Sequence, residues 1–151
     1  MLRDFHIHIQ EPQIEALAIL AAVTGSAIYT SDPIHEMGES RRELLDLILP
    51  SGQPVDARYP EWQSMKELRL IVTKAESGTL VYWFNPTNNE YFATPDWKEL
   101  AGADAEYVLQ YHGTSHKICE VPYVRVAPRT GQLFFVSNQE LESEPGNLWK
   151  W

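Results

Sequence analysis

The second half of the sequence is a succession of short runs rich in β-branched and aromatic residues, with no helix-length segment between them. Runs of this kind, separated by turn residues, are typical of β-strands. Parallel strands need a crossover connection of about a dozen residues or more, usually a helix, whereas antiparallel strands can be joined by tight turns. We therefore predict an antiparallel sheet, with strands at Leu68–Thr73, Thr79–Phe84, Glu90–Thr94, Ala105–Tyr111, Ile118–Val126 and Gln132–Val136.

The first third of the sequence predicts helices instead. Pro12 suits the first turn of a helix that runs to about Val23, and apolar residues cover nearly its whole circumference, so the rest of the fold must cover it. A second helix is predicted from about Glu39 to Leu49, and a short helical turn near Trp62. Before both, Arg3–Ile9 alternates polar and apolar residues as a strand does. The expected fold is α+β: an N-terminal strand and two helices packed on a largely antiparallel sheet of about five to six strands, in one domain spanning residues 1–151.

Composition and charge narrow the function classes. The 151 residues carry a net charge of −9, which argues against direct binding to nucleic acid phosphates or to an anionic membrane surface. The apolar run Ala16–Val23 is too short to span a bilayer, and acidic residues precede it where a secretion signal would be basic. Cys119, the single cysteine, has no partner for an intramolecular disulfide. A reducing, cytoplasmic compartment is the simplest expectation.

The negative charge is concentrated in the helical third of the chain. Residues 1–50 carry eight acidic and three basic side chains, which is more than half of the net charge of the whole chain. Four of these acids recur at steps of three, four and three, so a helix would gather them into one stripe: Glu36, Glu39, Glu43 and Asp46. A solvated helix face explains such a stripe; the functional alternative is an electrostatic surface for a basic partner protein.

Aromatic residues are concentrated in the strand-rich part. Between Tyr82 and Trp97 they come so close together that alternate members of the predicted strands must face opposite sides of the sheet. A core covered on both faces would absorb them. Otherwise Tyr82, Trp83 and Trp97 form an exposed aromatic surface suited to binding a partner. For the terminal Trp149 and Trp151 the same two alternatives hold: packing on the domain, or exposure as a segment that binds a partner.

Four of the five histidines occur in pairs. His6 and His8 point to one face of the predicted N-terminal strand, and His112 and His116 flank a loop after a later strand. If the two strands are neighbours, the four imidazoles could hold zinc, with Asp4 orienting one of them. The alternative is an ordinary polar strand face and a loop.

No phosphate-binding glycine loop and no nucleophile elbow is present in the sequence. We therefore expect a small acidic interaction protein that binds and inhibits or regulates a basic partner, of the immunity-protein or antitoxin type, with no cofactor and with Glu36, Glu39, Glu43, Asp46, Tyr82, Trp83 and Trp97 at its binding surface. The alternative is a small metal-dependent hydrolase or metal-binding domain that uses zinc and the paired histidines.

Overall fold

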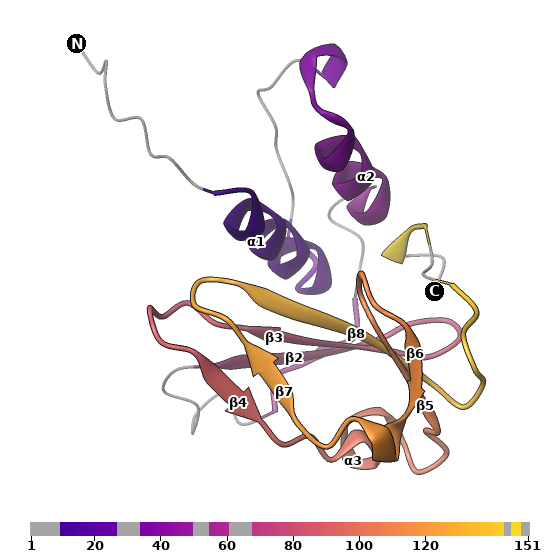
Figure 1. The fold of residues 1–151 in the computed structure, drawn as a ribbon. Coiled ribbons are helices and arrows are strands. Elements are labelled where there is room, and N and C mark those ends of the chain that lie inside the picture. The colour runs from indigo at the N-terminus through magenta and orange to yellow at the C-terminus, as the bar shows by residue number, and fades with distance from the viewer. Residues whose placement is uncertain (1–9, 27–33, 50–54, 61–67, 144–145, 149–151) are drawn as a thin grey trace.

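The computed structural model describes residues 10–26, 34–49, 55–60, 68–143 and 146–148. Within these residues the chain forms two helices, then a mostly β region (Figure 1). The helical elements are α1 (Glu11–Val23), the 3-10 turn η1 (Ile34–Glu36), α2 (Glu39–Ile48), α3 (Trp97–Ala101) and the 3-10 turn η2 (Ile118–Glu120). The strands are β1 (Ala57–Arg58), β2 (Arg69–Lys74), β3 (Thr79–Phe84), β4 (Tyr91–Ala93), β5 (Tyr107–Gln110), β6 (Ser115–Lys117), β7 (Val124–Val126) and β8 (Gly131–Ser137).

Six of the strands form one sheet in the order β1-β2-β3-β8-β5-β6, and β4 pairs with β7 in a separate two-stranded sheet. Every one of these strand pairs is antiparallel. The tight turn at Glu76–Gly78 joins β2 and β3 as a hairpin, as the sequence predicts. The α+β class and the antiparallel sheet are therefore confirmed.

The predicted strand Ile118–Val126 is wrong. In the structure these residues form the η2 turn and then only the short strand β7. The strand β6 ends just before them at Lys117, and β6 and β7 lie in different sheets. Pro122 lies in the connection between η2 and β7, where its missing N–H leaves no ladder hydrogen bond unmade. The chain uses this break to leave the large sheet and form the small one.

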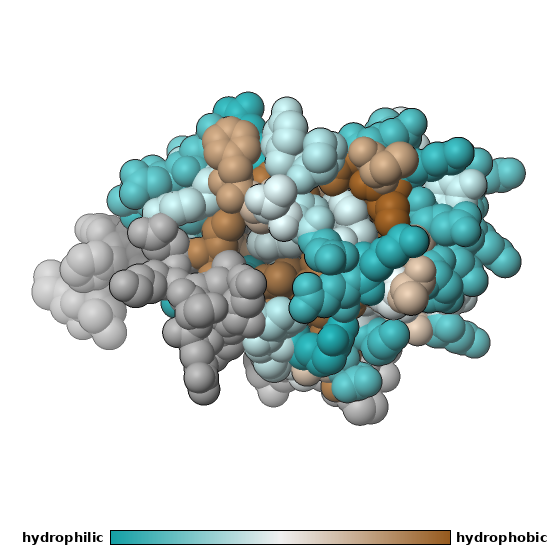
Figure 2. All heavy atoms as spheres, turned by 90° about the horizontal axis from the view of Figure 1, so that it is seen from below, coloured by the Kyte–Doolittle hydropathy of each residue, from teal (hydrophilic) through white to brown (hydrophobic). Residues whose placement is uncertain are grey.

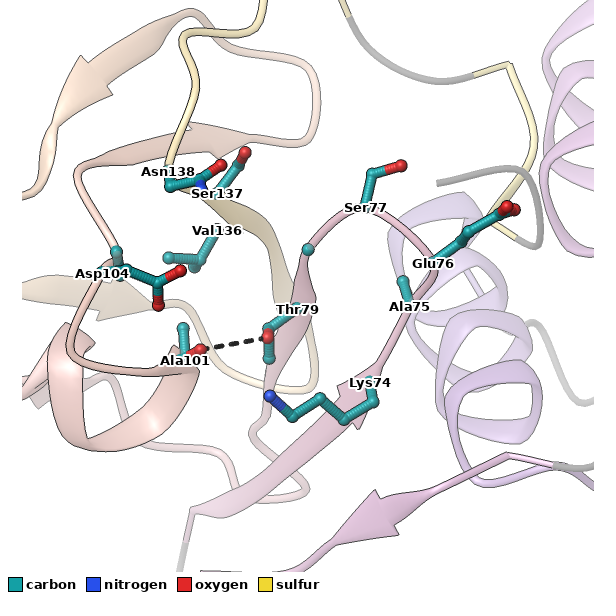
Figure 3. Close-up of a pocket in the computed structure, with 12 residues that line it drawn as sticks. Lys74, Ala75, Glu76, Ser77, Thr79, Ala101, Asp104, Val136, Ser137 and Asn138 are labelled. Atoms are coloured by element: carbon teal, nitrogen blue, oxygen red, sulfur yellow. Dashed lines mark hydrogen bonds between the residues drawn. The ribbon is translucent and has the colours of Figure 1, made fainter.

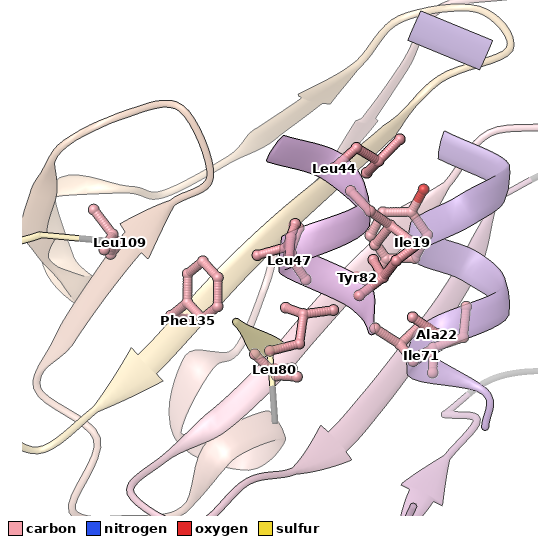
Figure 4. Packing of buried hydrophobic residues seen from close by; sticks show 13 residues of the cluster. Ile19, Ala22, Leu44, Leu47, Ile71, Leu80, Tyr82, Leu109 and Phe135 are labelled. Atoms are coloured by element: carbon pink, nitrogen blue, oxygen red, sulfur yellow. The ribbon is translucent and has the colours of Figure 1, made fainter. Parts of the chain in front are cut away.

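Helices α1 and α2 cover one face of the six-stranded sheet. Their apolar side chains meet Ile71, Leu80, Tyr82 and Phe135 from the central strands (Figure 4). Two hydrogen bonds fix α1 on the sheet: the Thr73 hydroxyl donates to the carbonyl of Val23 at 2.8 Å, and the Tyr82 hydroxyl donates to the carbonyl of Ala16 at 2.7 Å. Contacts with α2 and the sheet bury Ala16, Ile19, Ala22 and Val23 of α1, whereas Leu17 is 47% exposed, so the rest of the fold covers only part of this apolar helix.

The opposite face of the sheet is also covered. Here α3 and the β4–β7 sheet enclose a second core (Figure 1). Trp83, Trp97 and Phe134 form its aromatic centre, with ring centroids 5.3 to 5.7 Å apart. The strand alternation divides β3 between the two cores, since Tyr82 belongs to the helix-side core and Trp83 to the second core.

Three expectations fall outside the described residues: the strand at Arg3–Ile9, the helical turn near Trp62, and the terminal tryptophans Trp149 and Trp151. Among the residues that are described, no helix is both long and apolar enough to cross a membrane.

Candidate interaction surfaces

The acidic residues of α2 lie on its solvent side. Glu39, Glu43 and Asp46 are exposed, while Leu44, Leu47 and Ile48 from the same helix are buried against α1 and the sheet. Glu36 is exposed on the adjoining η1 turn. We call Glu39, Glu43 and Asp46 the acidic face. Its spacing places the three carboxylates on one side of the helix, as the sequence predicts.

The two arginines of α2, Arg41 and Arg42, contact residues outside the acidic face. Arg41 donates to Glu11 of α1, with Nη2 and Oε1 2.9 Å apart, and Arg42 donates to the backbone carbonyl of His35 at 3.2 Å. Within the described part of the chain, no ion pair involves Glu39, Glu43 or Asp46. The acidic face therefore keeps its charge available to an external cation.

The expected aromatic surface at Tyr82, Trp83 and Trp97 is not present. These side chains are only 1%, 3% and 4% exposed. Both faces of the sheet are covered, so the two cores absorb the rings. The indole N–H of Trp97 donates to the carbonyl of Val121 at 2.9 Å. This is a correction: these three residues are structural and cannot contact a partner without unfolding.

A different aromatic pair is exposed, and the sequence reasoning missed its role. Phe92 and Tyr123 are 61% and 60% exposed and lie side by side on the outer face of the β4–β7 sheet. The available signal was the spacing, because Tyr123 and Arg125 are two residues apart and so share one face of a strand. The spacing does not show whether that face is covered.

The described histidines do not converge. His112 Nε2 lies 3.3 Å from Glu15 Oε2, whereas His116 Nε2 lies 3.0 Å from the Thr114 hydroxyl and its Nδ1 lies 3.9 Å from Glu120. No group of three or more His, Cys, Asp or Glu side chains able to hold a metal occurs among the described residues. Asp4, His6 and His8 lie outside those residues, so the four-histidine zinc site stays a prediction.

A polar pocket of about 240 Å³ opens at the end of the β2–β3 hairpin, between that hairpin, the end of α3 and β8 (Figure 3). Lys74 and Asp104 point their polar atoms toward it, whereas the Ser77 hydroxyl points outward from the tip of the hairpin. Its buried hydroxyls are already used, since Thr79 donates to the carbonyl of Ala101 at 3.5 Å and Ser137 accepts from the Gln139 N–H. No imidazole lines this pocket.

A larger, apolar pocket of about 480 Å³ lies beside α1, lined by Leu17, Leu20 and residues of the β1–β2 edge and the end of β3. Arg69 is its only charged lining residue among those described. The pocket can take an apolar group but offers no catalytic constellation.

No protein-family model matches this sequence, and no curated protein matches it either. Solved structures do resemble the fold. A candidate α-N-acetylgalactosaminidase from Bacillus halodurans aligns with a TM-score of 0.72 at 11% identity, over 87% of this chain and 33% of that chain. Alpha-galactosidase I from Mortierella vinacea aligns with a TM-score of 0.63 at 11% identity, over 93% of this chain and 40% of that chain.

A candidate alpha-galactosidase from Bacteroides fragilis aligns with a TM-score of 0.60 at 13% identity, over 87% of this chain and 30% of that chain. The alignments therefore cover between about three tenths and two fifths of the length of these proteins. At such low identity the likeness concerns the fold alone, because one fold can carry unrelated functions.

Proposed function

We propose that this protein is an acidic interaction protein that binds and inhibits or regulates a basic partner protein through the acidic face of α2, in the manner of an immunity protein or an antitoxin. The observation that supports this function is the exposure of Glu39, Glu43 and Asp46 on one side of a helix whose other side is anchored in the core. A rigid helix holds the three carboxylates in fixed positions before the partner arrives.

The charge distribution explains how such a surface would act. Negative charges that are gathered on one face attract a basic partner over a range of about 8–10 Å at physiological ionic strength, which raises the association rate and selects basic proteins over acidic ones. The net charge of −9 adds a long-range field of the same sign. The ion pair with Glu11 compensates the charge of Arg41. Arg42 donates to the neutral carbonyl of His35, so it keeps its positive charge and partly opposes this field.

The test is a pull-down from the native host followed by kinetics on the basic protein recovered. In the triple variant Glu39→Lys, Glu43→Lys, Asp46→Lys, we expect the association rate to fall at least about tenfold at low salt, because steering accounts for factors of ten or more. Raising the salt concentration should slow association of the wild-type protein and leave the variant nearly unaffected.

A matched control changes the net charge by the same amount, by reversing three acidic residues elsewhere in the chain. Glu76, Glu99 and Asp104 are exposed acids that do not belong to α2, and their reversal to Lys should change the association rate much less. Equal effects of the two triple variants would show that only total charge matters, and the acidic face would then be rejected as the binding surface.

The zinc alternative is decided by a separate measurement. Elemental analysis of the untagged protein should find about one equivalent of transition metal if the paired histidines form a site, and His112→Ala should then remove it. Metal bound at that stoichiometry, with no basic partner recovered, would replace the proposed function.

A further inference from the structure

The outer face of the β4–β7 sheet carries an aromatic pair that the fold does not use. The rings of Phe92 and Tyr123 lie with their centroids 6.1 Å apart and their planes inclined by 56°, and both are exposed by 60% or more. The alternate residues Val124 and Val126 point inward to the second core. The inward side chains therefore fix the β4–β7 sheet on the second core, and the two rings point away from that core toward solvent.

A charged hydrogen-bonding pair adjoins the rings. Phe92 pairs directly with Arg125 across the two strands, so their side chains share a face, and strand alternation puts Glu90 and Tyr123 on the same face. The Arg125 Nε donates to Glu90 Oε2 at 2.6 Å. The Arg125 side chain is 66% exposed and that of Glu90 35%, so both keep hydrogen-bonding capacity toward solvent.

We propose that this face, formed by Phe92, Tyr123, Arg125 and Glu90, is a binding site for a neutral oligosaccharide. A pyranose ring has one face of C–H groups and a rim of hydroxyls. The C–H face stacks on an aromatic ring, whose negative face attracts the partly positive hydrogens. Sugar hydroxyls both donate and accept, so they match a guanidinium that donates and a carboxylate that accepts.

The charges favour a neutral sugar over an acidic one. Glu90 already compensates Arg125, so a carboxylate or sulfate on the ligand would meet a balanced pair on a protein whose net charge is −9. The site does not depend on the acidic face of α2, which lies across the large sheet from β4 and β7 (Figure 1).

The size of the surface favours a sugar over a protein. With 150–250 Å² for a whole aromatic side chain, two rings at about 60% exposure offer roughly 200–300 Å², whereas a standard protein interface takes about 800 Å² from each partner. Figure 2 views this side of the molecule, and its hydrophobic atoms lie in separate small patches among hydrophilic ones. One or two sugar rings fit that extent.

The experiment uses the whole chain. A glycan array with neutral, sialylated and sulfated glycans is followed by calorimetric titration with maltohexaose, cellohexaose and mannohexaose. We expect neutral glycans to bind in preference to charged ones. Phe92→Ala and Tyr123→Ala should each lower the affinity at least about tenfold, and Phe92→Tyr should retain it. Tyr59→Ala, which truncates an exposed aromatic residue on another part of the surface, should change affinity less than twofold.

Three results would overturn the site: no binding of any neutral glycan at millimolar concentration, binding that survives both alanine variants, or preferential binding of charged glycans or of a proline-rich decapeptide. Because the substituted side chains are exposed, the variants should keep the wild-type melting temperature, and that measurement separates loss of binding from loss of folding.

Discussion

At the scale of single residues, Tyr82 shows how one polar group is accommodated inside the larger core. The side chain is 1% exposed, and its hydroxyl donates to the carbonyl of Ala16 in α1. Burial raises the pKa of the Tyr82 phenol well above its usual value near 10, and the negative charge of Glu15 raises it further. Gly131 makes the position possible, because a Cβ there would lie 1.9 Å from the Tyr82 hydroxyl oxygen.

We predict a crossover with pH for Tyr82→Phe. At pH 7 the variant loses a hydrogen bond and should be about 1 kcal/mol less stable than the wild type. Above pH 10 the unfolded wild-type chain releases the phenol proton while the folded chain retains it. The free energy of unfolding of the wild type therefore falls by up to about 1.4 kcal/mol per pH unit, and this decrease is absent from the variant. The stability difference should therefore vanish between about pH 10 and 11.

Urea unfolding at a series of pH values measures this difference. Tyr123→Phe removes a hydroxyl from an exposed ring and should stay near the wild-type stability at pH 7. A constant penalty for Tyr82→Phe from pH 7 to 11 would show that the buried phenol does not couple folding to pH.

At the scale of elements, the sequence predicts most of the helices and strands because their signals are local. One such signal is Asp96 followed three residues later by Glu99, a pattern typical of the first turn of a helix. The Asp96 carboxylate does accept the Glu99 N–H at 3.0 Å. At Ile118–Val126 the local signals conflict, because the apolar residues fit one long strand whereas Pro122 interrupts it. The sequence does not show that β7 leaves the large sheet and pairs with β4, because that pairing joins distant parts of the chain.

The same distinction holds for the candidate surfaces. The acidic face of α2 follows from helical spacing, which is a local property of the chain. The burial of Tyr82, Trp83 and Trp97 depends on what covers each face of the sheet, and α1, α2 and α3 come from distant parts of the sequence. Spacing alone could therefore place these aromatic rings on strands but not decide between a core and a surface.

Removing the cap of α3 tests how far one short element supports the second core. Asp96→Ala leaves the Glu99 N–H without its side-chain acceptor and should lower the free energy of unfolding by about 1 kcal/mol. Trp97 and Leu100 enter the core from this helix, so near-ultraviolet circular dichroism should also weaken. Asp96→Asn keeps a side-chain acceptor, so it should lower the free energy of unfolding less than Asp96→Ala does. Glu99→Gln is the exposed control. The capping role would be contradicted if either of these two substitutions were as destabilising as Asp96→Ala.

At the scale of the whole molecule, the central strands join two cores that share no helix. Strand β3 contributes Leu80 and Tyr82 to one core and Val81 and Trp83 to the other. The acidic face lies on the helix side, and the Phe92–Tyr123 pair lies on the side of the small sheet. The two proposed binding surfaces thus use opposite sides of one scaffold, and a ligand on one leaves the other free.

Because the strands are shared, we predict that the two cores unfold together. Ile71 and Leu70 are neighbours on β2, buried in the helix-side core and the second core respectively. Ile71→Ala and Leu70→Ala should each cost about 2–5 kcal/mol. Both should lower the midpoint of a single transition, with helical circular dichroism and tryptophan fluorescence changing at the same denaturant concentration. If Leu70→Ala shifted the fluorescence change but left the helical signal at the wild-type midpoint, the sheet would not couple the cores, and each would unfold on its own.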